Sequence, residues 1–354
     1  MLKLSHKPSK KFANELLAWY DKNHRRLPWR VEAGETADPY AVWLSEIMLQ
    51  QTTVVTVKDY FETFLTRWPI VSDLAEAKLD EVLHAWQGLG YYARARNLHK
   101  CAQVVANDFD GQFPDTEDVL LTLPGIGPYT AAAVAAIAFG RETVPVDGNI
   151  ERVISRLYVV GEPLPGSKPI IKKLTSFAVS KTRPGDFAQA LMDLGATVCT
   201  PRNPQCIICP LSPVCDGRKL NCADQFPKKV PKKAKPTRRG IVFWAVDKNG
   251  AVLIRRRPEK GLLGGMMEFP STEWDETIWS EKVALEFAPV SAPSWQRLPG
   301  LVRHTFTHFH LELTVMTAKI NNFEPKSGVW CPISGLSDYA LPTLMKKVAK
   351  FASE

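Results

Sequence analysis

Four cysteines within a seventeen-residue segment, CTPRNPQCIICPLSPVC, constrain the fold of this chain more than any other feature. They are Cys199, Cys206, Cys209 and Cys215, separated by six, two and five residues. Four thiolates at these spacings can bind a tetrahedral zinc ion or the four corners of an iron-sulfur cube, because both favour soft sulfur ligands. The prolines of the segment favour a tight loop over a helix. The loop 199–215 is therefore predicted to be a metal site, with zinc and iron-sulfur both open.

The remaining cysteines do not indicate a disulfide framework. The chain of 354 residues has seven cysteines, and no function is assigned to Cys101, Cys222 or Cys331. An odd total in a chain without a signal-peptide pattern at its N-terminus argues for a reducing compartment. No apolar run approaches the roughly 18 residues that a membrane span needs. We therefore expect a cytoplasmic protein without a membrane partner.

Positive charge is concentrated in one segment, FPKKVPKKAKPTRR, at 226–239. Its five Lys and two Arg, with no acid, contribute +7 of the formal net charge of +8. Such a segment is either a solvated spacer or a strap that contacts nucleic-acid phosphates, because clustered cations release counterions from DNA. It also predicts a domain boundary, with one domain over 1–225, a basic linker over 226–239 and a second domain over 240–354.

The two predicted domains differ in pattern. Before the linker, apolar residues recur with helical spacing between Gly, Pro and Asn breakers, which predicts an all-α domain. The helical stretches are 40–65, 73–86, 92–108, 116–121, 128–139, 149–158, 168–180 and 186–196. After the linker, alternating segments and a hairpin signal at 248–250 predict an α+β domain with a mainly antiparallel sheet and helices near 276–287 and 341–352.

Three features of the helical domain could carry chemistry. Gly125 and Gly127 lie in a short turn, LPGIGPYTA, whose bare backbone amides can hold a phosphate, although helix connections often use glycine. Asp147 precedes Gly148, which is equally typical of a turn or a helix N-cap. Glu46 is either an ordinary exposed helical glutamate or, because its helix face is largely uncharged, a carboxyl that resists ionisation, as a general acid requires.

In order and spacing, these motifs resemble the helix-hairpin-helix DNA glycosylases that carry an iron-sulfur cluster, and within them the MutY family of adenine DNA glycosylases. The resemblance runs through WLSEIMLQQT, GLGYYARARNLHK, LPGIGPYTA, VPVDGN, the cysteine loop and RHTFTHFHLEL. It implies a monomer that removes adenine opposite 8-oxoguanine or guanine from duplex DNA in base excision repair. It also implies a 4Fe-4S cluster on the four cysteines and a nucleoid-associated location.

The resemblance assigns roles to individual residues. Glu46 would protonate the adenine ring and Asp147 would stabilise the oxocarbenium-like sugar, as paired carboxylates do in glycoside hydrolysis. Tyr129 would line the sugar side of the pocket, and Asn149 would orient the catalytic groups. The target base would be flipped out of the duplex. The DNA-contacting residues implied in the first domain are Trp29, Arg30, Gln51, Leu89, Tyr91, Gly125, Gly127 and Gln189.

The second domain resembles the Nudix-like domain that reads 8-oxoguanine. No acidic REUxEE helix follows Gly264-Gly265, which argues against pyrophosphate hydrolysis, and Phe306, Thr307 and His308 match the loop that meets the oxidised base. Two alternatives remain. One is an endonuclease III-like glycosylase and lyase on oxidised pyrimidines, although Tyr129 stands where that family has its lysine nucleophile. The other is a non-enzymatic metal-cluster or zinc protein that binds DNA.

Overall fold

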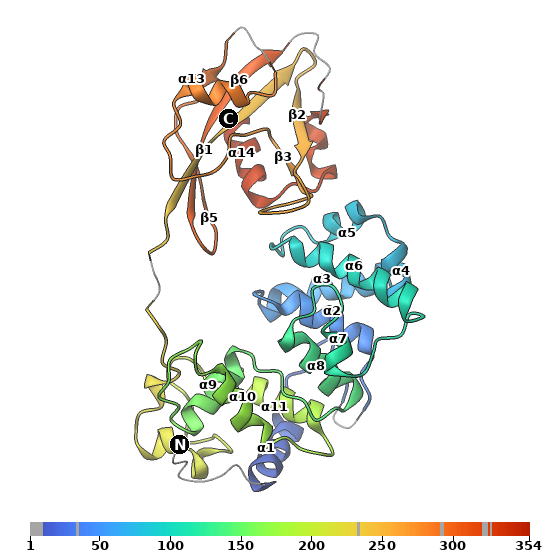
Figure 1. Cartoon of the computed structure of the whole chain (residues 1–354), viewed down its shortest axis with the longest axis vertical. Helices are drawn as coiled ribbons and strands as arrows, with labels where there is room; N and C mark the ends of the chain where they lie inside the picture. The colour runs from blue at the N-terminus through green and yellow to red at the C-terminus, as the bar shows by residue number, and fades with distance from the viewer. Residues whose placement is uncertain (1–9, 33–34, 232–233, 291–293, 321–324, 326–327) are drawn as a thin grey trace. The chain divides into compact units, whose positions relative to one another are not determined.

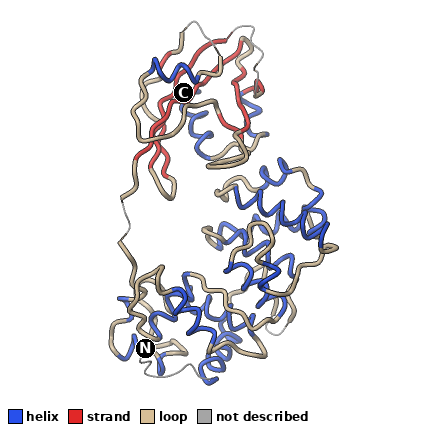
Figure 2. Tube along the Cα trace, in the orientation of Figure 1, coloured by secondary structure: helices blue, strands red, loops and turns tan. Residues whose placement is uncertain are grey.

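The structure, a computed structural model, describes residues 10–32, 35–231, 234–290, 294–320, 325 and 328–354. The chain forms two compact units, one of Met1–Ala77 with Asn97–Pro231 and the other of Lys78–Arg96 with Lys232–Glu354. Figure 2 shows that the strands of the described chain all belong to its C-terminal part. No described helix combines the length and the apolar character that crossing a membrane requires. The predicted division at 226–239 stays a prediction.

The N-terminal part of the chain is helical throughout its described residues (Figure 1). Its helices are α1 (Lys10–Asn23), α2 (Pro39–Leu49), α3 (Val54–Arg67), α4 (Val71–Glu76), α5 (Leu79–Ala85), α6 (Ala93–Asp108), α7 (Glu117–Leu120), α8 (Pro128–Phe139), α9 (Gly148–Leu157), α10 (Lys168–Ser176), α11 (Pro184–Thr197) and α12 (Asp216–Lys219). The predicted all-α architecture is therefore confirmed. Helix α11 packs against α1, α8 and α9, and α2 packs against α8 and α3.

Two of the predicted helices are each divided in two. The stretch 40–65 breaks between α2 and α3, where Gln51 adopts a positive φ of 57°. Thr53 then caps α3 by accepting a hydrogen bond from the backbone amide of Thr56. The stretch 73–86 likewise breaks between α4 and α5. Neither break carries a Gly or Pro, so the sequence pattern had no breaker to mark them, and α1 was not predicted at all.

The C-terminal part is built on one sheet with the order β3-β2-β1-β6-β4, to which β5 adds on β6 and β7 on β2. The strands are β1 (Thr237–Asp247), β2 (Ala251–Arg256), β3 (Met267–Glu268), β4 (Gln296–Arg297), β5 (Val302–Thr305), β6 (His310–Ile320) and β7 (Val329–Pro332). The hairpin predicted at 248–250 joins β1 to β2, with Gly250 at a φ of 80°. The predicted antiparallel sheet is confirmed for most pairs, but the long central pair β1 and β6 is parallel.

Both faces of this sheet are covered. Along β1, Val242 and Trp244 pack into the core that includes Leu344 and Val348 of α14 (Thr343–Ser353). The alternate residue Phe243 packs with Ala284 of the short helix α13 (Glu281–Ala284) on the opposite face. Successive strand residues point to opposite faces, so a strand covered on both sides is apolar at consecutive positions. The predicted α+β class is therefore confirmed.

Candidate active site

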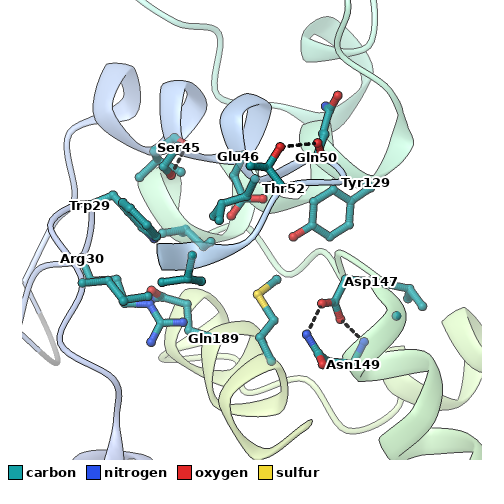
Figure 3. A pocket seen from close by; sticks show the side chains of 18 of the residues that line it. Trp29, Arg30, Ser45, Glu46, Gln50, Thr52, Tyr129, Asp147, Asn149 and Gln189 are labelled. Carbon is teal, nitrogen blue, oxygen red and sulfur yellow. Dashed lines mark hydrogen bonds between the residues drawn. The ribbon is translucent and has the colours of Figure 1, made fainter. Parts of the chain in front are cut away.

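A cavity of about 460 Å³ lies within the first compact unit, Met1–Ala77 with Asn97–Pro231, which we call the helical unit. The cavity gathers predicted catalytic residues that are far apart in the sequence. Glu46 comes from α2, Tyr129 from the first turn of α8, Asp147 from the residue that caps α9, and Gln189 from α11 (Figure 3). Trp29, Arg30, Gln51 and Asn149 line the same cavity. The structure therefore brings together the site residues that the sequence assigned to base removal.

Glu46 is a buried carboxyl, with only 6% of its surface exposed. Burial raises its pKa to about 7; the nearby Asp147 carboxylate adds to the rise, and hydrogen bonding by Tyr129 and the charge of Arg30 oppose it. Its Oε2 atom has no hydrogen-bond partner among the described residues. The predicted resistance of Glu46 to ionisation is confirmed, so this group can hold and deliver a proton near neutral pH.

Asp147 is the N-cap of α9. One carboxylate oxygen accepts from the backbone amides of Asn149 and Ile150 at 3.0 and 2.7 Å, and the other accepts from Asn149 Nδ2 at 2.7 Å. Burial raises the pKa of Asp147, and these hydrogen bonds limit the rise. The capping alternative and the catalytic alternative are therefore compatible, because the cap fixes the carboxylate at the cavity wall.

The turn before α8 needs one of its two glycines for steric reasons. Gly125 has a φ of 76°, and a Cβ there would lie 2.6 Å from the Cβ of Asn97. Gly127 is the N-cap of α8 at a φ of −95°, and a Cβ there would meet nothing within 4 Å. Gly125 therefore sets the shape of the turn. A phosphate contact by the backbone amides at the start of α8 stays a prediction.

The four predicted metal-ligating cysteines line one small cavity of about 30 Å³. Their mutual proximity adds to burial in raising the pKa of Cys209 to about 12 when no metal is bound. Among the described residues, no group of three or more His, Cys, Asp or Glu side chains is arranged to hold a metal ion. The metal at the cysteine loop therefore stays a prediction.

Two arginines of α9 connect this loop to the rest of the helical unit, and sequence analysis missed both. Arg156 is 2% exposed and donates to the backbone carbonyls of Thr200, Pro201 and Phe226 at 2.7 to 3.1 Å. Its Nη1 also lies 3.4 Å from the Sγ atom of Cys199. Arg152 donates to Asn149 Oδ1 at 2.9 Å and, through Nε, to the Cys199 carbonyl at 2.7 Å.

Comparisons with known proteins agree with this geometry. Residues 44–177 match the HhH-GPD superfamily base excision DNA repair protein family, and residues 241–350 match the NUDIX domain family. Adenine DNA glycosylase of Homo sapiens is 36% identical over 95% of this chain and 73% of its own length; that of Buchnera aphidicola is 31% identical over 95% and 97%. The chain belongs to the adenine DNA glycosylase family. It is therefore a DNA glycosylase, a hydrolase of base excision repair.

Solved structures support the fold assignment. A thermostable thymine-DNA glycosylase matches with a TM-score of 0.54 and 33% identity, over 60% of this chain and 97% of that one. An endonuclease III-DNA complex matches with a TM-score of 0.51 at 24% identity, over 60% of this chain and 98% of that one, and this likeness concerns the fold alone. Because the chain belongs to the adenine DNA glycosylase family, the alternative of a non-enzymatic DNA-binding metal protein is excluded.

The DNA-contacting residues predicted for the adenine DNA glycosylase lie in varied settings. Gln51 and Tyr91 both adopt positive φ angles, of 57° and 47°, and Tyr91 is 45% exposed. In the second unit, the Tyr91 hydroxyl is hydrogen-bonded to the Thr307 hydroxyl. Strained backbone at an exposed side chain is typical of functional sites. Leu89, by contrast, is only 5% exposed, so its side chain does not present a surface to DNA in this structure.

The predicted lesion loop follows β5. Its Phe306 packs against Trp274 and Phe309, which fixes the loop to the core of the second unit. Thr307 and His308 are exposed beside it. An anchored aromatic residue followed by two exposed polar residues can present hydrogen-bonding groups to a partner at low conformational cost. Their role as readers of a base stays a prediction.

Proposed function

We propose that this enzyme hydrolyses the N-glycosidic bond of adenine paired with 8-oxoguanine or guanine in duplex DNA, acting as a monomer. The observation that carries the proposal is a buried Glu46, with a pKa near 7, facing the same cavity as Asp147. A carboxyl that can hold a proton near neutral pH, beside a second carboxyl fixed by hydrogen bonds from Asn149 and Ile150, is suited to acid catalysis and charge stabilisation at one glycosidic bond.

In the proposed mechanism, Glu46 donates its proton to a ring nitrogen of a flipped adenine, and the bond to the sugar then breaks with its electron pair leaving on the neutral base. Asp147 stays ionised and stabilises the positive charge that develops on the sugar. Water attacks the sugar, and its proton passes to the Glu46 carboxylate, which restores the acid. Asn149 holds Asp147 in place through the 2.7 Å hydrogen bond from its amide.

This mechanism predicts a pH limit set by Glu46. The active enzyme has a protonated Glu46, and burial raises the pKa of Glu46 to about 7. The excision rate should therefore fall as the pH rises through about 7, and above it the loss should approach tenfold per pH unit. Single-turnover rates measured between pH 5.5 and 9 test this dependence. A rate that stays constant from pH 6 to 9 would remove Glu46 from the proton-donor role.

We further propose that Cys199, Cys206, Cys209 and Cys215 hold a 4Fe-4S cluster. The residues fit the group: four thiols line one cavity, and the buried Arg156 guanidinium lies 3.4 Å from the Sγ atom of Cys199. When bound, such a cluster joins four points of the loop covalently. Arg152 and Arg156 then tie that loop to α9, whose N-cap is Asp147.

The cluster proposal predicts about four irons per chain and a brown protein whose visible absorption is bleached by acid. Cys199→Ser should lower the iron content and weaken DNA affinity more than it slows excision from bound substrate, because the loop and not the pocket loses its support. Metal analysis with single-turnover kinetics makes the measurement. A colourless, active protein with one zinc per chain would select the mononuclear site.

For the lesion loop, we propose that Thr307 and His308 contact the oxidised guanine. Thr307→Ser should be nearly silent, because the hydroxyl is kept. The pair Thr307→Ala and His308→Ala should reduce the affinity for adenine opposite 8-oxoguanine by about 1–3 kcal/mol without slowing excision. Binding measured on matched duplexes with guanine in place of 8-oxoguanine is the control. Slower excision with unchanged affinity would contradict the proposed contact of Thr307 and His308 with the oxidised guanine.

The proposed reaction is tested directly on a duplex with one adenine opposite 8-oxoguanine. Base loss with strand cleavage only after alkali is the expected result, because Tyr129 lies in the cavity where a lyase needs an amine. Strand cleavage without alkali, and a borohydride-trapped covalent adduct, would instead select the endonuclease III-like reaction. Equal rates on adenine opposite thymine would contradict the mispair preference.

A further inference from the structure

Asp193 of α11 is a carboxylate with no solvent exposure, and its two arginine partners line the cavity that holds Glu46. It accepts four hydrogen bonds, two from each of two arginines. Arg25 donates through its backbone N at 2.9 Å and its Nε at 2.6 Å, and Arg30 donates through Nη1 at 2.6 Å and Nη2 at 2.9 Å. Burial raises the pKa of Asp193, but the hydrogen bonds and charge of Arg30 and the charge of Arg25 outweigh it and lower the pKa below its usual value. Asp193 is therefore ionised at neutral pH.

Arg30 is the electrostatic connection between Asp193 and Glu46. Its side chain is 7% exposed, and it lines the base cavity. Burial disfavours its charge, but the hydrogen bonds and charge of Asp193 more than restore it, so its pKa is raised. The Arg30 charge in turn lowers the pKa of Glu46. An uncompensated guanidinium at this place would favour the ionised form of Glu46, which cannot donate a proton.

The other charged groups around the cavity leave Asp193 as the group that compensates Arg30. The titratable side chains that line the cavity with Glu46 are Arg25, Arg30, Tyr129, Asp147, Glu151 and Lys168. Lys168 forms an ion pair with Glu151 at 2.9 Å. Asp147 is held by α9, and its negative charge raises the pKa of Glu46. The two arginines both pair with Asp193, so one buried carboxylate serves two cations.

We propose that Asp193 is a positioning residue for base excision: it fixes the Arg30 guanidinium at the wall of the base cavity and offsets its charge, so that Glu46 remains protonated when DNA binds. This inference rests on the proposed role of Glu46 as the proton donor. It adds a residue that touches neither the base nor the sugar, and that acts through Arg30. Its signature is a change in pH dependence, which a purely structural role would not produce.

The test compares single-turnover excision from pH 5.5 to 9 for the wild type, Asp193→Asn, Asp193→Glu and Asp186→Asn. Asp193→Asn should move the alkaline limb to lower pH, with a loss of roughly tenfold at pH 8 and under about threefold at pH 5.5. Asp193→Glu keeps the charge and should restore the wild-type limb. Asp186 lies on the same helix and pairs with Arg183 at 2.7 Å, so Asp186→Asn is the matched control. A pH profile of Asp193→Asn that is parallel to the wild type would overturn the inference.

A direct titration separates this inference from the proposed function. Carboxyl carbon NMR of the full chain, with the Glu46 signal assigned by its loss in Glu46→Gln, should show a lower pKa for Glu46 in Asp193→Asn. If Glu46→Gln remains active while this shift is seen, the proposed function fails and the electrostatic inference stands. If Glu46→Gln is inactive and the Glu46 pKa is unmoved, the inference fails alone.

Removing one member of a buried ion pair can prevent folding. The double variant Arg30→Gln with Asp193→Asn removes both charges, so the buried Arg30 guanidinium is not left without its carboxylate. Arg25 also loses Asp193, but its side chain is 28% exposed and can be solvated. Its Glu46 should titrate at or above the wild-type pKa in the same NMR experiment, because the cation that favours ionisation is gone. A Glu46 pKa below the wild-type value in the folded double variant would contradict the inference.

Discussion

Replacing Glu46 with Gln is expected to abolish adenine release while leaving DNA affinity near that of the wild type. The amide has the same volume, so the cavity should keep its shape, but it has no acidic proton to deliver to the base. A loss of roughly 10²–10⁴-fold in the single-turnover rate is the scale that general acid catalysis provides. Gel-shift or fluorescence titration on the same duplex measures the affinity separately.

The control for this variant is Glu62→Gln, an identical change at an exposed position of α3, which should leave the rate unchanged. Any residual activity of Glu46→Gln should also lose the alkaline limb, because the group that titrates near 7 is gone. Turnover at the wild-type rate at neutral pH would exclude Glu46 as the proton donor, whatever the behaviour of Asp147.

Replacing the buried Arg156 with Met is expected to destabilise the helical unit by about 3–5 kcal/mol, because four backbone carbonyls, that of the buried Phe226 among them, lose the same donor. Those carbonyls belong to Cys199, Thr200, Pro201 and Phe226. Methionine keeps much of the side-chain volume, so the loss reports hydrogen bonding and charge more than a cavity. Urea unfolding with metal analysis on the same samples measures stability and iron retention.

Arg218→Met is the matched control, because Arg218 lines the same cysteine cavity but is exposed. Its effect should stay within about 0.5 kcal/mol. Equal stability of the two variants would show that the Arg156 hydrogen bonds contribute no more than solvent contacts would. Full stability with lost iron would instead assign Arg156 to the metal site alone.

Short sequence patterns predicted two features of the site, the helix cap at Asp147 and the carboxyl of Glu46 that resists ionisation. Asp147 before Gly148 indicated a cap, and the cap is what fixes its carboxylate. Glu46 on an uncharged helix face indicated a carboxyl that resists ionisation, and it is buried with a raised pKa. For Asp147 the amides of Asn149 and Ile150, within three residues, decide the environment. For Glu46 the uncharged helix face indicated burial, but the Tyr129, Asp147 and Arg30 groups that adjust its pKa come from distant parts of the chain.

Other features depend on partners far along the chain, which a local pattern cannot reveal. Asp193 looks like an ordinary helical acid until Arg30 is placed beside it, 163 residues away in sequence. The parallel pairing of β1 with β6 joins residues more than seventy positions apart, from Thr237 with His310 onward. The break at Gln51 is likewise unmarked in the sequence, since its positive φ is held without a glycine.

The basic segment that begins at 226 is anchored before it leaves the helical unit. The Leu164 amide donates to the Lys228 carbonyl at 2.8 Å, and Val230 donates back to the Leu164 carbonyl at 3.4 Å. Phe226 is buried there and accepts from Arg156. A chain that ended at Gln225 would therefore contain all four cysteines of the loop. It would lack the Phe226 carbonyl that accepts from Arg156 and both backbone hydrogen bonds to Leu164. During synthesis, the helical unit is complete only when Val230 has left the ribosome.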